Sequence, residues 1–228
     1  MSNNDSEDIQ LVIARYNEKL KWLDDDLFRN VPSICYNSGI DKDFHTPENM
    51  NVVNIENIGK EAYVYIYHIV KNYDNLAEIT VFLPGSTDEP SRHDQVKKLM
   101  LELKTNKKTI FYSNNHDDIK KDLYNFSLDT WCSTNSENIK LNSKCNLTLS
   151  EIRPFGKWYE STFGDIKTTR VNYRGVFAIE KKYIIQRPRS FYEKLLAQFK
   201  TPNDEVAHYF ERAWEAVFYP MEDGIFNM

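Results

Sequence analysis

The residues best suited to do chemistry lie close together near the C-terminus of the 228-residue chain. His208, Glu211 and Arg212 are spaced three and four residues apart, so a helix places them on one face. An acidic turn with Asp204 and Glu205 comes directly before them. Such groups can exchange protons with a substrate. The same pattern is also typical of a solvated helix face with ordinary i,i+4 ion pairs, and both interpretations stay open.

A second set of polar residues follows the apolar run at residues 9–14. In open α/β sheets, ligands bind just beyond the carboxyl ends of the strands. If this strand is central, the predicted ligand contacts are Arg15, Tyr16, Asn17 and Glu18. The alternative is loop and helix-cap chemistry, with Asn17 as the N-cap.

A third polar segment, residues 86–94, follows a fully apolar run at 79–83. Its Asp88, Glu89 and His93 can supply oxygen and imidazole ligands for magnesium or manganese. Such clusters also occur in many solvated loops, and this spacing matches no tight metal motif. The sequence therefore indicates a candidate metal site but does not establish that these residues bind a metal.

Composition bounds the class of protein. The chain is 41% hydrophobic and 14% aromatic, which is typical of a globular protein with one substantial core. Its net charge of −5 argues against broad nucleic-acid binding, because that needs a basic surface to displace counterions from phosphates. We therefore expect no nucleic-acid partner.

Cysteine usage and the N-terminal residues bear on the compartment. Cys35, Cys132 and Cys145 are odd in number and irregularly spaced, so we expect neither a disulfide framework nor a zinc site. The start of the chain is polar and acidic, unlike a secretory signal, and no apolar stretch approaches the length of a membrane span. The sequence predicts a cytoplasmic chain with no membrane span.

The hydrophobic pattern alternates between strand-like and helix-like segments, which predicts one three-layer α/β/α domain around a mostly parallel sheet. Strands are expected at residues 9–14, 31–36, 52–55, 79–83, 109–112 and 173–179, and helices at 19–27, 61–73, 96–103, 184–196 and 203–218.

The predicted domain spans residues 9–220, between a disordered tail at 1–8 and a C-terminal tail at 221–228. Residues 135–146 are rich in Ser, Asn and Lys, and we interpret them as a surface insertion. The chain contains no Gly-rich phosphate loop, Walker sequence or nucleophile elbow. The common motifs therefore name no reaction.

Several segments together resemble a family of domains of unknown function, found mainly in fungi with some viral and bacterial members. The matching segments are residues 12–18, 57–61, 67–76, 80–83, 175–179, 187–192 and 208–214. The resemblance covers most of the chain in order, and it names a relative without naming a reaction.

A weaker resemblance does imply a reaction. The strand that leads into residues 15–18 resembles the first strand and loop of nucleotide-sugar glycosyltransferases of the GT-A type. Residues 173–179 resemble the strand that floors their acceptor pocket, and 203–206 resemble the acidic turn that supplies a catalytic base. The chain is also similar to a glycosyltransferase domain that large algal viruses use on capsid sugars.

This second resemblance implies a GT-A-like fold, a nucleotide-diphosphate sugar donor, and a glycan, lipid or protein acceptor. It gives the role of base to Glu205 or Asp204, with His208 as a further catalytic candidate. Beyond the four residues after the first strand, the implied nucleotide-sugar contacts are Gly59, Glu61, Arg174, Gly175 and Arg212.

The chain departs from the GT-A pattern where an Asp-x-Asp metal motif is expected. After the buried strand only the later Asp88 and Glu89 are present, so the use of manganese or magnesium stays open. Without a metal, the charge of the leaving diphosphate must be offset by His208, Arg212 or Arg174. Two alternatives remain: a non-catalytic binding or interaction protein on the same fold, and a metal-dependent hydrolase that uses Asp88, His93 and Asp94.

Overall fold

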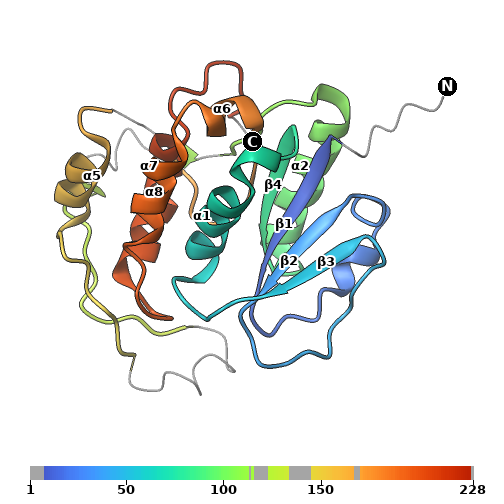
Figure 1. The fold of residues 1–228 in the computed structure, drawn as a ribbon, viewed down its shortest axis with the longest axis horizontal. Helices are drawn as coiled ribbons and strands as arrows, with labels where there is room; N and C mark the ends of the chain where they lie inside the picture. The colour runs from blue at the N-terminus through green and yellow to red at the C-terminus, as the bar shows by residue number, and fades with distance from the viewer. Residues whose placement is uncertain (1–7, 113, 116–122, 134–144, 167–169, 227–228) are drawn as a thin grey trace.

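The structure is a computed structural model that describes residues 8–112, 114–115, 123–133, 145–166 and 170–226. Its main sheet has five strands in the order β3-β2-β1-β4-β7 (Figure 1). These strands are β1 Ile9–Arg15, β2 Ser33–Asn37, β3 Met50–Asn54, β4 Ile79–Pro84 and β7 Phe177–Glu180. β5 Asn114–Asn115 and β6 Arg170–Val171 form a separate short pair. The four first strands are parallel and β7 is antiparallel, which confirms the predicted α/β class with a mostly parallel sheet.

Burial follows the position of each strand in the sheet. All six residues of β4 are buried, as expected for a continuous apolar run covered on both faces. β1 lies between β2 and β4, with Val12 opposite Ile34 on one side and Phe82 on the other. β3 is half-exposed, because it forms an edge of the sheet.

Helices cover both faces of the sheet (Figure 1). One face packs against α1 Lys60–Asn72, α7 Arg189–Leu196 and α8 Glu205–Val217, and the other against α2 Pro90–Asn106. The short α6 Lys181–Ile185 follows β7, and α5 Phe155–Phe163 packs outside α8. This arrangement agrees with the predicted three layers.

Aromatic side chains fill the layer between the sheet and helices α1 and α8. The ring of Tyr65 lies 4.8 Å from that of Phe82, and the ring of Phe177 lies 5.2 Å from that of Trp214. Such pairs stabilise a core beyond the area they bury. They hold the middle of α1 and the last turn of α8 against strands β4 and β7.

Two predicted elements differ from the structure. The helix predicted at 19–27 is a single turn of 3-10 helix, η1 Lys21–Asp24, which begins after Leu20 in the left-handed region at φ 57°. The strand predicted at 109–112 makes only isolated bridges, with Ile110 between Ala178 and Ile225. Apolar spacing alone does not reveal that the chain turns between such short buried contacts.

The predicted tails and insertion are described only in part. Residues 221–226 pack onto the domain: the Phe111 N–H donates to the Ile225 carbonyl at 2.8 Å, and the Ile225 N–H donates to the Thr109 carbonyl at 2.9 Å. Residues 1–7 of the predicted N-terminal tail and 135–144 of the predicted insertion lie outside the described residues. Within the described part, no helix has both the length and the apolar character to cross a membrane.

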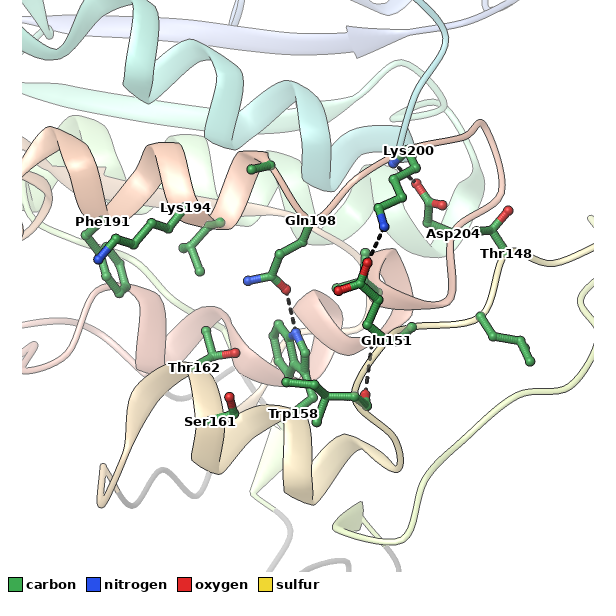
Figure 2. Close-up of a pocket in the computed structure, with 16 residues that line it drawn as sticks. Thr148, Glu151, Trp158, Ser161, Thr162, Phe191, Lys194, Gln198, Lys200 and Asp204 are labelled. Atoms are coloured by element: carbon green, nitrogen blue, oxygen red, sulfur yellow. Dashed lines mark hydrogen bonds and ion pairs between the residues drawn. The ribbon is translucent and has the colours of Figure 1, made fainter.

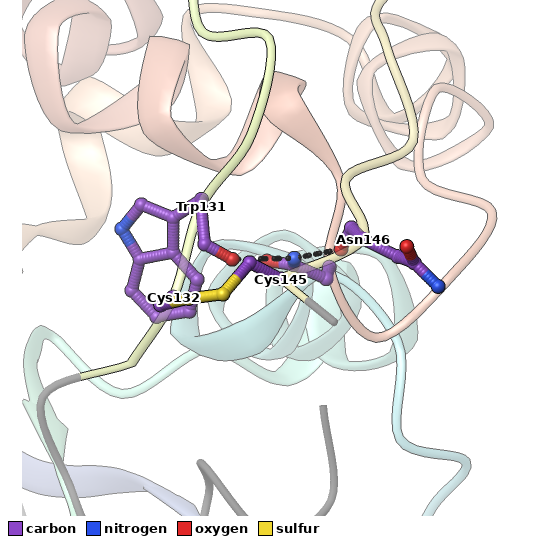
Figure 3. Close-up of a disulfide and its surroundings, with 5 residues drawn as sticks. Trp131, Cys132, Cys145 and Asn146 are labelled. Carbon is purple, nitrogen blue, oxygen red and sulfur yellow. Dashed lines mark hydrogen bonds between the residues drawn. A yellow bond between two sulfur atoms is a disulfide. The ribbon is translucent and has the colours of Figure 1, made fainter. Parts of the chain in front are cut away.

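The cysteines need a correction. Cys132 and Cys145 form a disulfide with a Cα–Cα distance of 4.6 Å (Figure 3). Counting cysteines missed this bond because an odd total and irregular spacing do not exclude one pair plus one free thiol. The free thiol is Cys35, which is buried in the sheet, and burial raises its pKa to about 12.

Candidate functional site

The order of the strands defines where a ligand is expected. From β1 the chain moves to β2 and β3 on one side, and then returns through α1 to β4 on the other side of β1. The carboxyl ends of β1 and β4 therefore form the topological switch point at which open α/β sheets bind ligands. The candidate site is built on this edge.

The loop after β1 is held tightly against the loop after β4. One carboxylate oxygen of Glu18 accepts hydrogen bonds from the backbone N–H groups of Tyr16 and Asn17, at 2.7 and 3.1 Å. A Cβ added at Gly85 would lie 2.7 Å from the same oxygen, so only glycine allows this approach. Tyr16, Asn17 and Glu18 stay partly exposed at the switch point, as the sequence predicted.

Arg15 is placed differently from its three neighbours, because it is only 1% exposed. Its guanidinium donates to the carbonyls of Glu18, Tyr16 and Asp41 and to the side chain of Asn37. Arg15 therefore positions the loop from beneath instead of facing a ligand. Sequence reasoning missed Asn37 and Asp41, its partners after β2.

A second group of charged side chains gathers beside this loop, on the first turns of α1 and α8. Lys60 and Glu61 begin α1, while His208, Glu211 and Arg212 lie along one side of α8. The sequence predicted Glu61, His208 and Arg212 as site residues, and the structure brings these three together. It adds Lys60, which the sequence analysis did not single out.

Lys60 and His208 form a close pair. The ammonium of Lys60 lies 3.1 Å from Nε2 of His208 and 3.1 Å from the centre of the Trp131 ring. Burial lowers the pKa of Lys60 to about 8, and burial with the nearby positive charges lowers the pKa of His208 to about 3. Nε2 of a neutral His208 can accept a hydrogen bond from the Lys60 ammonium, and its Nδ1 lies 4.0 Å from Glu211.

The backbone at the start of α1 also has an unusual conformation. Gly59 and Lys60 both have φ near 57°, and the second value is unusual for a residue with a side chain. Sparsely populated backbone conformations cluster at functional sites, where the surrounding structure must hold them. The Gly59 N–H donates to the Thr201 carbonyl at 2.8 Å, which ties the start of α1 to the turn before α8.

Glu211 is the most perturbed acid of the group. Burial, followed by the negative charge of Glu61, raises its pKa to about 8, although Arg212, Lys60 and Arg92 act in the opposite direction. Its side chain is still 24% exposed. A carboxyl group that titrates near neutral pH and can be reached from solvent is suited to accept a proton.

Two arginines, Arg212 on α8 and Arg92 on α2, lower the pKa of Glu211 by their positive charge. Arg212 lies 3.5 Å from Glu211 and stacks over Phe126 at 3.4 Å. Arg92 on α2 donates to Ser86 after β4. Arg174 donates to the Ser91 carbonyl at 2.6 Å, which places it near the start of α2, apart from Glu211 in its contacts. Arginine side chains therefore lie between the switch-point loops and the charged group on α1 and α8.

Gly175 lies under Glu61. It has φ 62°, and a Cβ at this position would come 3.3 Å from Cγ of Glu61. Its carbonyl accepts a hydrogen bond of 2.8 Å from the hydroxyl of Tyr65. Gly59 and Gly175, both predicted as nucleotide-sugar contacts, lie at this edge and shape the backbone there.

The acids of the turn that was expected to supply a catalytic base have a structural role instead. Glu205 is 0% exposed, and its oxygens accept from the Leu128 and Ser150 N–H groups and the Tyr209 hydroxyl. It also pairs with Arg153 at 2.8 Å.

Asp204 is engaged in the same way. It is 2% exposed and accepts from the backbone N–H groups of Lys200 and Thr201. Both acids thus hold the turn before α8, and the charge of Asp204 also acts on Lys60, where it opposes the lowering of the Lys60 pKa by burial.

The predicted metal ligands do not come together. Glu89 pairs with Arg92 at 2.8 Å, and Asp88 and Glu89 are exposed. Among the described residues, which include Asp88, Glu89, His93 and Asp94, no three acidic, histidine or cysteine side chains converge as metal ligands. These residues do not fit a metal centre, because they lie along one turn and the start of α2 without converging.

One cavity in the described part of the chain lies away from this edge. It has a volume of about 350 Å³ and is enclosed between α5, α7 and residues 148–152 (Figure 2). Two pairs of its polar groups contact each other: Glu151 with Lys200, and the Trp158 indole N–H with Gln198 at 2.6 Å. We place the candidate site at the switch point instead, because the groups with shifted pKa values, Lys60, His208 and Glu211, lie there.

Similarity to known proteins adds a family. A family model described as "Protein of unknown function (DUF3431)" matches residues 11–224. No curated protein matches the chain. The matched range includes every strand of the main sheet and all residues of the candidate site.

Proposed function

The chain belongs to the family of unknown function DUF3431, and from its site we propose that it is a glycosyltransferase that moves a sugar from a nucleotide-diphosphate sugar to a hydroxyl acceptor. The observation that carries this proposal is Glu211, a partly exposed carboxyl group with a raised pKa, set among cations at the switch point. The proposal keeps the reaction implied by the sequence resemblance and moves the base from the acidic turn to α8.

In this mechanism Glu211 accepts the proton of the acceptor hydroxyl. The hydroxyl oxygen bonds to the anomeric carbon while the bond from that carbon to the diphosphate breaks. A base with a pKa near the working pH is effective in this step, because it is unprotonated often enough and still basic enough. Glu61 contributes by its charge, which raises the pKa of Glu211.

The leaving diphosphate needs positive charge. Arg92 and Arg212 lie on two sides of Glu211, and guanidinium groups bind phosphate oxygens through two parallel hydrogen bonds. We assign them to the diphosphate, and the partly exposed Tyr16 and Asn17 to the nucleoside. Manganese or magnesium enters no step, since the described residues offer no converging ligand set.

A second candidate is a binding or interaction protein that keeps the fold without transfer chemistry. It is favoured by one observation: the two acids of the turn before α8, Asp204 and Glu205, are used up in structural hydrogen bonds. The two functions differ in what Glu211 does. A transferase needs its carboxylate, whereas a binding protein needs only the shape and charge of the site.

The first experiment is a thermal-shift screen against nucleotides and nucleotide sugars, each with and without manganese. A ligand that binds the native state raises Tm by mass action. We expect a shift with at least one nucleotide-diphosphate sugar. If no nucleotide or nucleotide sugar raises Tm, the donor site is refuted.

With a donor in hand, Glu211→Gln tests the base. We expect turnover to fall by about 10²-fold or more, with the donor still bound, because the amide cannot take a proton. Glu193→Gln, at an exposed position on α7, is the matched control and keeps full turnover. Unchanged turnover in Glu211→Gln would remove this residue as the base, and donor binding without any turnover in the unmodified protein would favour the binding-protein alternative.

A further inference from the structure

We propose that the Cys132–Cys145 disulfide is a redox switch: it holds Trp131 over Lys60 and His208, and its reduction uncovers them. The switch would regulate the candidate site, so its meaning for turnover rests on the glycosyltransferase proposal. The uncovering itself does not rest on that proposal, because it follows from contacts of described residues.

Trp131 covers the charged pair directly. Its ring centre lies 3.1 Å from the Lys60 ammonium and 5.1 Å from the centre of the His208 ring. Lys60 and His208 are in turn neighbours of Glu211, through its 4.0 Å approach to His208 and its electrostatic interaction with Lys60. An aromatic ring in this position limits the access of solvent to one side of Glu211, the proposed base.

The disulfide is a covalent restraint directly beside this tryptophan in the chain. Cys132 is the next residue in the chain, and Figure 3 shows the Trp131 ring beside the bonded sulfur. The remaining backbone contacts are long: the Trp131 N–H donates to the Cys145 carbonyl at 3.3 Å, and the Asn203 side chain donates to the Trp131 carbonyl at 3.4 Å. Upstream, Thr130 is exposed, and the exposed Asp129 pairs with Arg153 at 2.9 Å.

Reduction removes this restraint in a balanced two-electron step. A thiolate of a dithiol reductant attacks one sulfur, and the second thiol of the reductant then releases the mixed disulfide. Cys132 and Cys145 end as thiols, and the reductant ends as a disulfide. The bond joins residues 13 apart, so its loss frees the segment that carries Trp131.

The third cysteine does not interfere with this exchange. Cys35 is 0% exposed within the sheet, and burial raises the pKa of its thiol to about 12. A buried thiol that stays protonated is a poor nucleophile toward a disulfide. The change therefore stays within one pair of cysteines.

The test is the rate at which Lys60 reacts with an amine-reactive acylating reagent, measured by peptide mass spectrometry. The full chain is labelled in its oxidised form and after treatment with dithiothreitol, with Lys194, exposed on α7, as the internal reference. We expect reduction to raise the labelling rate of Lys60 several-fold relative to Lys194. Circular dichroism checks that both forms stay folded.

Two variants separate the switch from general loosening. A Cys132→Ser and Cys145→Ser double variant should label Lys60 at the rate of the reduced protein under both conditions. Trp131→Ala should label Lys60 fast even when the disulfide is intact. Fast labelling in these variants, with Lys194 unchanged, supports a cover made by this one side chain.

Two results would overturn the proposal. One is equal labelling of Lys60 in the oxidised and reduced protein. The other is three alkylatable cysteines in unfolded, unreduced protein, which means that the disulfide does not form. Because labelling needs no sugar donor, a switch that works while no nucleotide sugar binds would refute only the proposed function.

Discussion

The two charged regions at the carboxyl edge of the sheet are built in opposite ways. Around Arg15 the buried charge has hydrogen-bond partners on three segments of chain, including Asn37 and Asp41. Around Glu211 the nearest cations stay at 3.5 Å or more, and the closest contact of Lys60 is with a neutral imidazole. The first region provides hydrogen-bond partners for its buried charge, and the second contains titratable groups with shifted pKa values.

This difference separates scaffold from site. A buried charge with several hydrogen bonds rigidifies its surroundings, whereas a crowded group of charges with shifted pKa values is typical of a functional site. We therefore expect changes at Arg15 to act on stability, and changes at Glu211 to act on turnover. Three measurements can break this comparison or sharpen it.

The largest effect is expected for Arg15→Met. The substitution leaves the Asn37 side chain and the Asp41 carbonyl without their buried donor, and removing one partner of a buried charged network costs about 3–5 kcal/mol. Urea denaturation measures the loss in unfolding free energy. Arg29→Met, in an exposed ion pair, is the control with little effect. A stable Arg15→Met protein would contradict the scaffold role.

The next effect is a dependence of stability on pH that comes from His208. Its pKa lies near 3 in the folded protein against an ordinary value of 6.5, so the unfolded chain binds the proton first as pH falls. The stabilisation is complete above pH 6.5 and is lost toward pH 3, and at pH 5 it has fallen by about 2 kcal/mol. Lys60 and Arg212 face His208 and disfavour its protonation.

His208→Asn tests this dependence, because asparagine does not titrate. Between pH 7 and 5, the variant should lose about 2 kcal/mol less unfolding free energy than the unmodified protein, measured in urea at each pH. His68 is the internal comparison, since burial also lowers its pKa to about 3. Parallel curves for the His208 variant and the unmodified protein would show that His208 is not held neutral.

The smallest effect is expected for Tyr65→Phe. The substitution removes the hydroxyl that donates to the Gly175 carbonyl at 2.8 Å and keeps the ring in the core. A buried hydrogen bond of this kind contributes about 1 kcal/mol. Thermal unfolding measures the loss, and Tyr124→Phe at a partly exposed position is the control. A loss well above this range would mean that Tyr65 also supports the charges around Glu61.

A feature of the fold or site could be predicted from the sequence when the residues that form it lie close together along the chain. The strands and the loop at residues 16–18 follow from local patterns. The structure confirms the predicted strands except the one at 109–112, and it places that loop at the switch point. The perturbation of Glu211 by Glu61 joins residues far apart in the chain, and no local pattern contains it.

Two further misses have the same origin. Glu205 looks like a free acid in the sequence, because its partners at residues 128, 150 and 153 are supplied by a distant segment. The pairing of Cys132 with Cys145 likewise depends on chain segments that meet only in the fold. The available signal for Lys60 was its place directly after Gly59 at the start of a helix.

The two edges of the main sheet bear on self-association. The edge at β7 is covered, because Ile110 forms one β-bridge with Ala178 of β7 and a second β-bridge with Ile225. The other edge, β3, is open but only five residues long, with exposed asparagines at positions 51 and 54. Short, polar edge strands are poor templates for adding a further strand. The sheet is thereby protected from growing into edge-to-edge aggregates.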